Sequence, residues 1–222
     1  MTIIYLMRHS EPLNVDYINT FDDIQVQNEK KILSVLGEDL AKKVSCSDVF
    51  ANIDCVYSSN YVRAMSTAKY VADKNNLKIN IVDDLGERKF GVLSYDEIPN
   101  DFVRRQFFDD NYKIGTGESQ SEVRNRVYSS IVDILNSNRD KKSVVVSHST
   151  AMSYLFKMLC VVSIVNDNIK YVFNDKTFFE GNFDYCETFK LCFDDNNNLI
   201  DICNVNVKDW FFWSAFLFSC SY

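Results

Sequence analysis

Short apolar, β-branched runs alternate along this chain with segments of helical periodicity, and this alternation limits the fold more than any other feature. Strands that alternate with helices typically build an α/β domain in which helices cover a largely parallel sheet. We therefore predict a three-layer α/β/α fold, with a largely parallel central sheet and helices on both faces. The predicted strands are residues 3–7, 54–58, 79–82 and 143–147, the predicted helices are about 34–44, 61–74, 119–136 and 150–161, and a closing pair of strands is expected near 187–194 and 199–205.

Local signals support these boundaries and a single domain. Ser119 and Glu122 form an S-x-x-E capping box at the start of the third predicted helix. The Asp- and Asn-rich run 194–198 is typical of a hairpin turn. The chain has only two prolines and no glycine-rich linker. We therefore predict one domain over residues 1–222, with residues 92–118 inserted over the functional site.

Composition excludes some classes of protein. The 24 basic and 31 acidic residues give a net charge of −7, which argues against a general nucleic-acid-binding protein. The seven cysteines are odd in number and contain no C-x-x-C pair, so they favour a reducing, cytoplasmic location. The N-terminal apolar run lacks the features of a signal peptide.

The C-terminus ends in a strongly aromatic run, residues 210–222. This run is shorter than the ~20 residues that span a bilayer, so we expect no membrane span. Packing of the run on its own domain is favoured over a partner contact, a homodimer face or contact with a membrane. A homodimer is left open.

Both histidines of the chain follow the apolar run of a predicted strand, His9 at the first strand and His148 at the fourth. The second strand leads into a helix that carries Arg63. Ligands of open α/β sheets bind beyond the carboxyl ends of the strands. We therefore expect Arg8, His9, Arg63 and His148 to converge on one anion-binding pocket at this edge of the sheet.

These residue types limit the chemistry. Two histidines do not complete a zinc shell, and no H-x-x-x-H or H-E-x-x-H motif accompanies them. The G-x-S-x-G elbow of serine hydrolases is also absent from the sequence. Two imidazoles beside two guanidiniums instead suit phosphoryl transfer, in which a neutral imidazole attacks phosphorus and arginines bind the equatorial oxygens. Nearby cations lower the imidazole pKa and so keep the nucleophile unprotonated.

Six short motifs occur in the order typical of one family. R-H-G is similar to residues 8–10, L-S/T-x-x-G to 33–37, S-S-P-x-x-R-A-x-x-T-A to 58–68, L-x-E-x-x-F/Y-G to 85–91, G-E-S to 117–119 and V-S-H-G to 146–149. A single R-H pair carries no weight, but six ordered motifs over about residues 1–160 are specific. The chain therefore resembles the histidine phosphatase superfamily, also called the phosphoglycerate mutase-like family.

The resemblance implies a role for each matching residue. His9 would become phosphorylated, Arg8, Arg63 and His148 would form the phosphate pocket, and Glu87 would be the general acid. No metal and no organic cofactor is implied. The implied function is a metal-independent phosphomonoester hydrolase that acts through a phosphohistidine on a small anionic phosphorylated metabolite. The alternatives are a phosphoglycerate mutase-type transfer and, less favoured, a non-catalytic binding or regulatory protein.

Several positions depart from the family pattern. Ser10 and Ser149 replace the glycines that follow the two histidines. We predict both serines and Arg88 as further substrate contacts. Glu11 competes with Glu87 for the role of the acid. Asn14 stands one residue before the position where the family often carries asparagine, and the frequent W-E-G is absent, so the identity of the substrate stays open.

Overall fold

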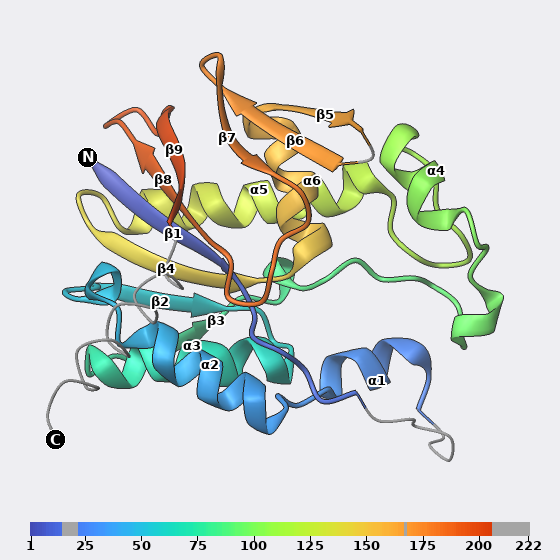
Figure 1. Ribbon diagram of the computed structural model, residues 1–222, viewed down its shortest axis with the longest axis horizontal. Helices are drawn as coiled ribbons and strands as arrows, with labels where there is room; N and C mark the ends of the chain where they lie inside the picture. The colour runs from blue at the N-terminus through green and yellow to red at the C-terminus, as the bar shows by residue number, and fades with distance from the viewer. Residues whose placement is uncertain (15–21, 167, 206–222) are drawn as a thin grey trace, which may run out of the picture.

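The computed structural model describes residues 1–14, 22–166 and 168–205 (Figure 1). Its central sheet has the strand order β3-β2-β4-β1-β8-β9. The first four of these strands are parallel, whereas β8 and β9 form an antiparallel hairpin that pairs with β1. The predicted largely parallel sheet and its closing hairpin are thus confirmed. The strands are β1 (Thr2–Arg8), β2 (Cys55–Ser58), β3 (Ile79–Ile81), β4 (Lys142–Ser147), β8 (Thr188–Phe193) and β9 (Leu199–Val205).

Helices cover both faces of this sheet, as predicted. In Figure 1, α1, α2 and α3 lie below the sheet, and α5 and α6 lie above it. Ser34 caps α2 by accepting from the N–H of Gly37 at 2.9 Å, and Ser119 with Glu122 forms the predicted capping box of α5. The sequence did not predict the short helices α1 and α4. The helices are α1 (Ile24–Lys30), α2 (Val35–Ser45), α3 (Val62–Lys74), α4 (Phe102–Phe108), α5 (Gln120–Ser137) and α6 (Ser149–Leu159).

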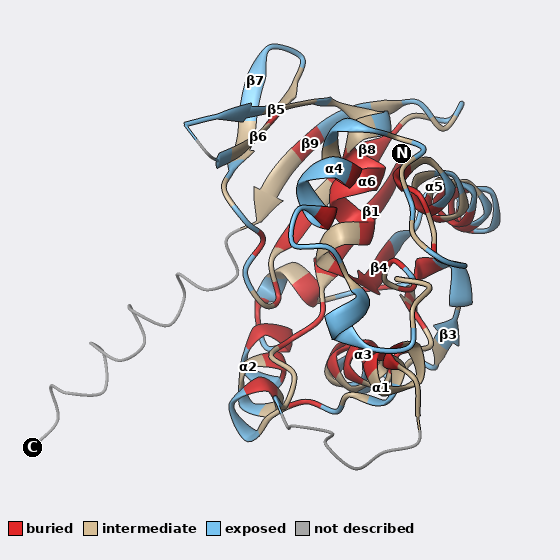
Figure 2. Ribbon diagram, turned by 90° about the vertical axis from the view of Figure 1, so that its right-hand side faces the viewer, coloured by how far each residue is buried: buried red, intermediate tan, exposed pale blue. Residues whose placement is uncertain are grey.

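The strand β1 is buried on both faces and divides the core in two. Ile4 and Leu6 join an apolar cluster with residues of α5 and α6, whereas Tyr5 and Met7 join a second cluster with residues of α2 and α3. Successive side chains of a strand point to opposite faces, so a strand covered on both sides requires a continuous apolar run. Figure 2 shows β1 and α6 as mostly buried ribbon.

Parallel pairing brings the carboxyl ends of three strands to one edge of the sheet. Arg8 lies opposite Ser147 in the register of β1 and β4, and Ser58 lies opposite Val146 in the register of β2 and β4. The two histidines follow β1 and β4 directly. The predicted common edge is therefore confirmed.

A second sheet, which the sequence did not predict, lies over α6 (Figure 1). The predicted helix 150–161 ends at Leu159, because a β-branched run follows it as a strand. Asn174 and Asp175 both have positive φ, 48° and 60°, in the two-residue turn between the last two strands of this sheet. Such a turn is typical of a β-hairpin and was the available sequence signal. The antiparallel strands are β5 (Val161–Val165), β6 (Asn168–Phe173) and β7 (Lys176–Glu180).

Two features of the sequence lie outside the described residues. They are the aromatic run 210–222 and Val15, the position at which the family often has asparagine. Asn14 is exposed at the end of a described segment. Within the described residues, no helix combines the length and the apolar character needed to cross a bilayer.

Candidate active site

His9 lies just beyond β1, and both of its ring nitrogens have fixed partners. Nδ1 is 2.6 Å from the carbonyl oxygen of Ser10, which can only accept, so Nδ1 carries the proton. Nε2 accepts from Nε of Arg63 at 3.0 Å. The ring is therefore a neutral imidazole with its lone pair on Nε2, which is the state that a nucleophile requires.

His148 shares Arg63 with His9. Nη2 of Arg63 donates to Nδ1 of His148 at 3.1 Å, and Nε2 of His148 therefore donates to the hydroxyl of Ser59 at 2.7 Å. The remaining nitrogen, Nη1 of Arg63, donates to the carbonyl of Asn28. The ring centroids of the two histidines are 5.0 Å apart. One guanidinium thus joins the two imidazoles, as the predicted convergence requires.

Both imidazoles are buried, with exposed fractions of 5% for His9 and 0% for His148. Burial, and after it the charge of Arg63, lowers the pKa of each ring well below the ordinary value of 6.5. From the sequence, nearby cations were expected to be the cause. Burial is the larger cause, because the charged ring would lose its hydration. Both rings are therefore neutral at pH 7.

Arg8 is the last residue of β1, and it lies beside His9. Its Nη1 donates to the carbonyl of Phe183, and its guanidinium carbon lies 4.4 Å from the ring centroid of Tyr185. The ring of His9 lies 6.4 Å from that same tyrosine ring. The Nε atom of Arg8 is buried and has no hydrogen-bond partner. A buried donor without a partner is costly, so this N–H is suited to receive an anion.

Glu87 is held at the amino end of α6. Its Oε1 accepts from the N–H groups of Ala151 at 3.0 Å and Arg88 at 2.9 Å, and its Oε2 accepts from the N–H of Thr150 at 3.2 Å. These partners are backbone groups rather than a cationic side chain. The carboxylate therefore faces the helix end that begins directly after His148, next to the imidazole pair.

The loop that carries Glu87 is fixed by Arg126 of α5. Nη1 of Arg126 donates to the carbonyls of Asp84 at 2.7 Å and Gly86 at 2.9 Å, and Nη2 donates to the carbonyl of Glu87 at 3.1 Å. Nε and Nη2 also bind the two carboxylate oxygens of Glu118 at 2.7 and 2.8 Å. Arg126 was not predicted from the sequence as part of the site. Its partner Glu118, in the G-E-S motif, was the available signal.

The loop after His9 is fixed by residues of two other motifs. The N–H of Ser10 donates to Oγ1 of Thr67 at 2.9 Å, and the Ser10 hydroxyl donates to the carbonyl of Gly37 at 2.7 Å. Gly37 lies so close to Glu11 that a Cβ would overlap the carbonyl oxygen of Glu11. The Ser10 hydroxyl thus fixes the loop, and its contact with substrate stays a prediction.

Arg88 is buried beneath α4. Its Nη1 donates to Oε1 of Gln106 at 2.8 Å. Its guanidinium carbon lies 4.6 Å from the ring centroid of Phe90 and 4.9 Å from that of Phe102. The structure therefore places Arg88 within the aromatic packing of α4, with its buried Nε without a hydrogen-bond partner, and its contact with substrate stays a prediction. The direction in which a long side chain turns is decided by this packing, which the motif does not encode.

Ser149 is the first residue of α6 and lines a cavity of about 150 Å³ between α6, α4 and the second sheet. Neither Ser149 nor Ser10 has a positive φ, so the serines that replace the family's glycines do not strain the backbone. The cavity is lined by Val103, Phe107, Ser149, Thr150, Ser153, Tyr154, Ile169, Tyr171, Gly181, Asn182 and Phe183.

The segment 92–118 leaves and rejoins the rest of the chain at one point. Gly91 has a φ of +78°, and its carbonyl accepts from the N–H of Thr116 at 3.1 Å. A Cβ on Gly91 would overlap the backbone of Gly117. The two glycines thus allow the two ends of the segment to touch, and the segment carries α4 over Arg88.

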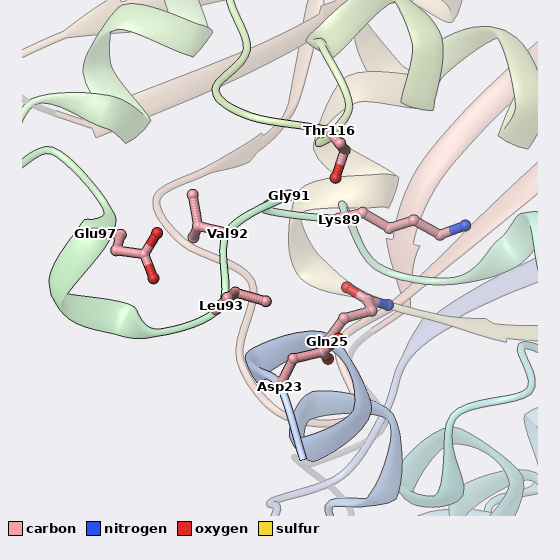
Figure 3. A pocket seen from close by; sticks show the side chains of 8 residues that line it. All are labelled: Asp23, Gln25, Lys89, Gly91, Val92, Leu93, Glu97 and Thr116. Atoms are coloured by element: carbon pink, nitrogen blue, oxygen red, sulfur yellow. The ribbon is translucent and has the colours of Figure 1, made fainter. Parts of the chain in front are cut away.

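A second cleft, of about 440 Å³, lies between α1 and the base of this segment (Figure 3). The side chains of Gln25 and Lys89 extend toward the same side of the cleft, with Thr116 above them (Figure 3). Nε2 of Gln25 donates to the hydroxyl of Tyr61 at 2.8 Å, and the ring of Tyr61 lies 4.6 Å from that of His148. One aromatic ring therefore separates this cleft from the imidazole pair. The lining residues are Asp23, Gln25, Lys89, Gly91, Val92, Leu93, Glu97 and Thr116.

Comparison with known proteins decides the family. A family model described as the histidine phosphatase superfamily (branch 1) matches residues 4–167. The chain belongs to this superfamily. A probable phosphoglycerate mutase GpmB of Yersinia enterocolitica is 28% identical over 166 residues, which cover 72% of this chain and 75% of that protein.

Two solved structures share the fold of this chain at low sequence identity. A mycobacterial glucosyl-3-phosphoglycerate phosphatase in complex with inorganic phosphate is 16% identical, with a TM-score of 0.67 and coverage of 92% of this chain and 98% of its own. Bacillus stearothermophilus YhfR is 18% identical, with a TM-score of 0.66 and coverage of 90% and 95%. These likenesses confirm the predicted fold.

Proposed function

We propose that this protein is a phosphomonoester hydrolase that acts through a phosphohistidine on His9. The hydrogen bonding of His9 carries the proposal, because the proton on Nδ1 is held by Ser10 and the lone pair therefore lies on Nε2. Burial keeps the ring neutral, and Arg8 and Arg63 supply N–H groups for the equatorial phosphate oxygens. Phosphatases among the structural neighbours support this reaction class.

In the first step, Nε2 of His9 attacks phosphorus, the bond from phosphorus to the ester oxygen breaks, and Glu87 gives its proton to the leaving oxygen. Arg63 must turn its donors from the imidazoles to the phosphate oxygens for this attack. In the second step, water attacks the phosphohistidine and gives its proton to Glu87. The N–P bond then breaks, which releases inorganic phosphate and restores the neutral ring. His148 positions Arg63 in the resting site, through the bond to Nη2, before Arg63 turns to the phosphate.

A phosphoglycerate mutase-type transfer is the second candidate, because several relatives carry that name. A mutase must hold the second anionic group of its substrate while it shields the phosphoenzyme from water. Arg88, a predicted substrate contact, donates through Nη1 to Gln106 between two aromatic rings. This arrangement favours hydrolysis. A non-catalytic role is favoured least, because Arg63 joins His9 and His148 and both imidazoles are neutral, as the chemistry requires.

Brief incubation with a ³²P-labelled phosphomonoester tests the proposal. The wild-type protein should yield a phosphoenzyme that is labile in acid and stable in base, and His9→Ala should yield none. Label that persists in His9→Ala, or that maps to a cysteine, would contradict the assignment. Addition of 2,3-bisphosphoglycerate and 3-phosphoglycerate distinguishes the mutase, which would transfer label to the second substrate rather than release it as phosphate.

We also propose that the reaction needs no metal and that the segment 92–118 covers the site. Within the described residues, no group of three or more His, Cys, Asp and Glu side chains is placed to hold a metal ion. Equal rates of p-nitrophenyl phosphate hydrolysis in EDTA and in added Mg²⁺ are expected, and a rate that depends on Mg²⁺ would contradict the proposal.

A single domain over residues 1–222, a cytoplasmic location and the absence of nucleic-acid binding stay predictions from the sequence, and a homodimer stays open.

A further inference from the structure

We propose that the substrate's leaving group is an uncharged aromatic ring, and that it binds in the cavity between α6, α4 and the second sheet. The inference rests on the proposed hydrolase function, because it assigns the cavity to the group that departs in that reaction. It adds a substrate class, an aryl or benzyl-type phosphomonoester, which the chemistry at His9 alone does not select.

The cavity adjoins the candidate site on two sides. Thr150 lines it, and the N–H of Thr150 binds the carboxylate of Glu87 at 3.2 Å. Phe183 also lines it, and the carbonyl of Phe183 accepts from Arg8. The leaving oxygen must face Glu87 to receive its proton. The group attached to that oxygen therefore lies against the first turn of α6, at the cavity wall.

The lining fits an apolar ring better than an anion. Aliphatic side chains and hydroxyls fill the spaces between four aromatic rings, and among the described residues none that lines the cavity has a charged side chain. A volume of about 150 Å³ holds a ring the size of benzene. Aromatic walls also favour edge-to-face contact with such a ring. The four rings belong to Phe107, Tyr154, Tyr171 and Phe183.

The cavity walls are fixed before any ligand binds. The hydroxyls of Tyr171 and Ser153 are 2.9 Å apart, and the hydroxyl of Tyr154 donates to Gln106 at 3.0 Å. Neither flanking cation lines the cavity. Nη1 of Arg88 donates to Gln106 and its buried Nε, which has no partner, lies outside the lining, while Lys157 donates to the carbonyl of Phe107. A carboxylate or second phosphate in the cavity would therefore lose its hydration without contacting a cationic lining residue.

The cleft of Figure 3 is the competing location for a charged leaving group. Its lining includes Lys89, which is exposed and extends along the cleft wall (Figure 3). Asp23 and Glu97 lie in the same lining and oppose an anionic group. The two locations make different predictions, because only the aromatic cavity favours an uncharged ring over a carboxylate.

Binding of two phosphonates, benzylphosphonate and methylphosphonate, tests the assignment without any turnover. Isothermal titration with wild-type protein should show benzylphosphonate binding at least about tenfold more tightly. Ile169→Ala should reduce this preference by about tenfold, because Ile169 lines the cavity. Ile164→Ala is the matched control, since Ile164 is the strand partner of Ile169 in β5 but does not line the cavity. Unchanged methylphosphonate affinity in both variants shows that the phosphate site is intact.

The outcomes separate this inference from the proposed function. Equal affinity of the wild-type protein for the two phosphonates, or equal loss in both variants, would overturn the aromatic cavity even if phosphomonoesters are hydrolysed. A preference that Ile169→Ala alone removes, without turnover of any phosphomonoester, would overturn the hydrolase and leave the cavity assignment standing. If both proposals are correct, kcat/KM for phenyl phosphate should exceed that for 3-phosphoglycerate by at least about tenfold in the wild-type protein. The ratio of the two kcat/KM values should be much smaller in Ile169→Ala.

Discussion

The candidate site has a phosphate end and a leaving-group end, named for the groups that we propose bind there. The two ends consist of different kinds of side chain. At the phosphate end, the ends of β1 and β4 and the start of α3 place two neutral imidazoles around one guanidinium, all buried. At the leaving-group end, α4, α6 and the second sheet with the segment after it provide aromatic rings and hydroxyls (Figure 2). Under the two proposals above, the first end carries out the reaction and the second selects the substrate. Substitutions at the two ends should therefore change different kinetic quantities.

Loss of the nucleophile should give the largest effect. His9→Ala removes the atom that carries the phosphoryl group, so kcat should fall by about 10⁴-fold or more. The loss should be the same for p-nitrophenyl phosphate and phenyl phosphate, because both substrates use the phosphate end alike. Steady-state kinetics on both substrates measures this. A variant that keeps most of its activity on either substrate would break the division between the two ends.

Glu87 lies between the two ends, so the loss of rate on its substitution should depend on the leaving group. General acid catalysis typically contributes about 10²–10⁴-fold. Glu87→Gln should lose that much rate on phenyl phosphate and far less on p-nitrophenyl phosphate, whose phenolate departs with little help. The ratio of the two kcat values is the measurement. Equal losses would make Glu87 a residue that positions phosphate, and wild-type rates on both substrates would move the acid role to Glu11.

Arg126 should affect stability and the position of Glu87 together. Arg126→Met breaks a largely buried ion pair with Glu118 and three bonds to backbone carbonyls, so the free energy of unfolding should fall by about 2–4 kcal/mol. Urea denaturation measures this loss. Arg124→Met is the matched control on the same helix, because its ion pair with Asp110 is more exposed and should contribute about 0–1 kcal/mol.

The kinetic readout distinguishes positioning from stability alone. At a temperature where both variants are fully folded, Arg126→Met should lower kcat on phenyl phosphate while leaving methylphosphonate affinity near the wild-type value. If kcat falls equally in both arginine variants, Arg126 does not position Glu87 through its contacts with the loop.

The buried imidazoles should make stability fall in mild acid. Their pKa values in the folded protein lie well below 6.5, whereas in the unfolded chain both rings titrate near the ordinary value of about 6.5. The unfolded state then binds more protons, so their contribution to stability is complete above about pH 6.5 and is lost as the pH falls below it. The loss should reach about 1.4 kcal/mol per pH unit for each ring.

Urea denaturation between pH 7.5 and pH 5 measures this slope, a range that stays above the ordinary carboxyl pKa values. His9→Gln should roughly halve the slope. The acid limb of the kcat/KM profile should likewise lie below pH 6.5, since protonation of His9 removes the nucleophile. A stability that does not change over this range would contradict neutral, buried rings.

The phosphate end could be predicted from sequence far better than the other end. His9 and His148 follow strands whose apolar runs are continuous, so pattern and topology together place them at one edge. Ser59 and Thr67, which hold His148 and the loop after His9, lie within a motif that the sequence analysis recognised without assigning them a task. The second sheet was missed, because its short strands show no clear alternation and its Asn174 turn lacks the usual glycine.

The contact between Gly91 and Gly117 has a consequence for how this chain could diversify. Because the two ends of the intervening segment already touch, its length adds only slowly to the entropy of closing the loop, at about 0.6 kcal/mol for each doubling. Residues could be added to the segment, deleted from it or exchanged with those of a relative while the glycine junction stays in register. A library of grafts between these two glycines would therefore sample new leaving groups on an unaltered catalytic frame.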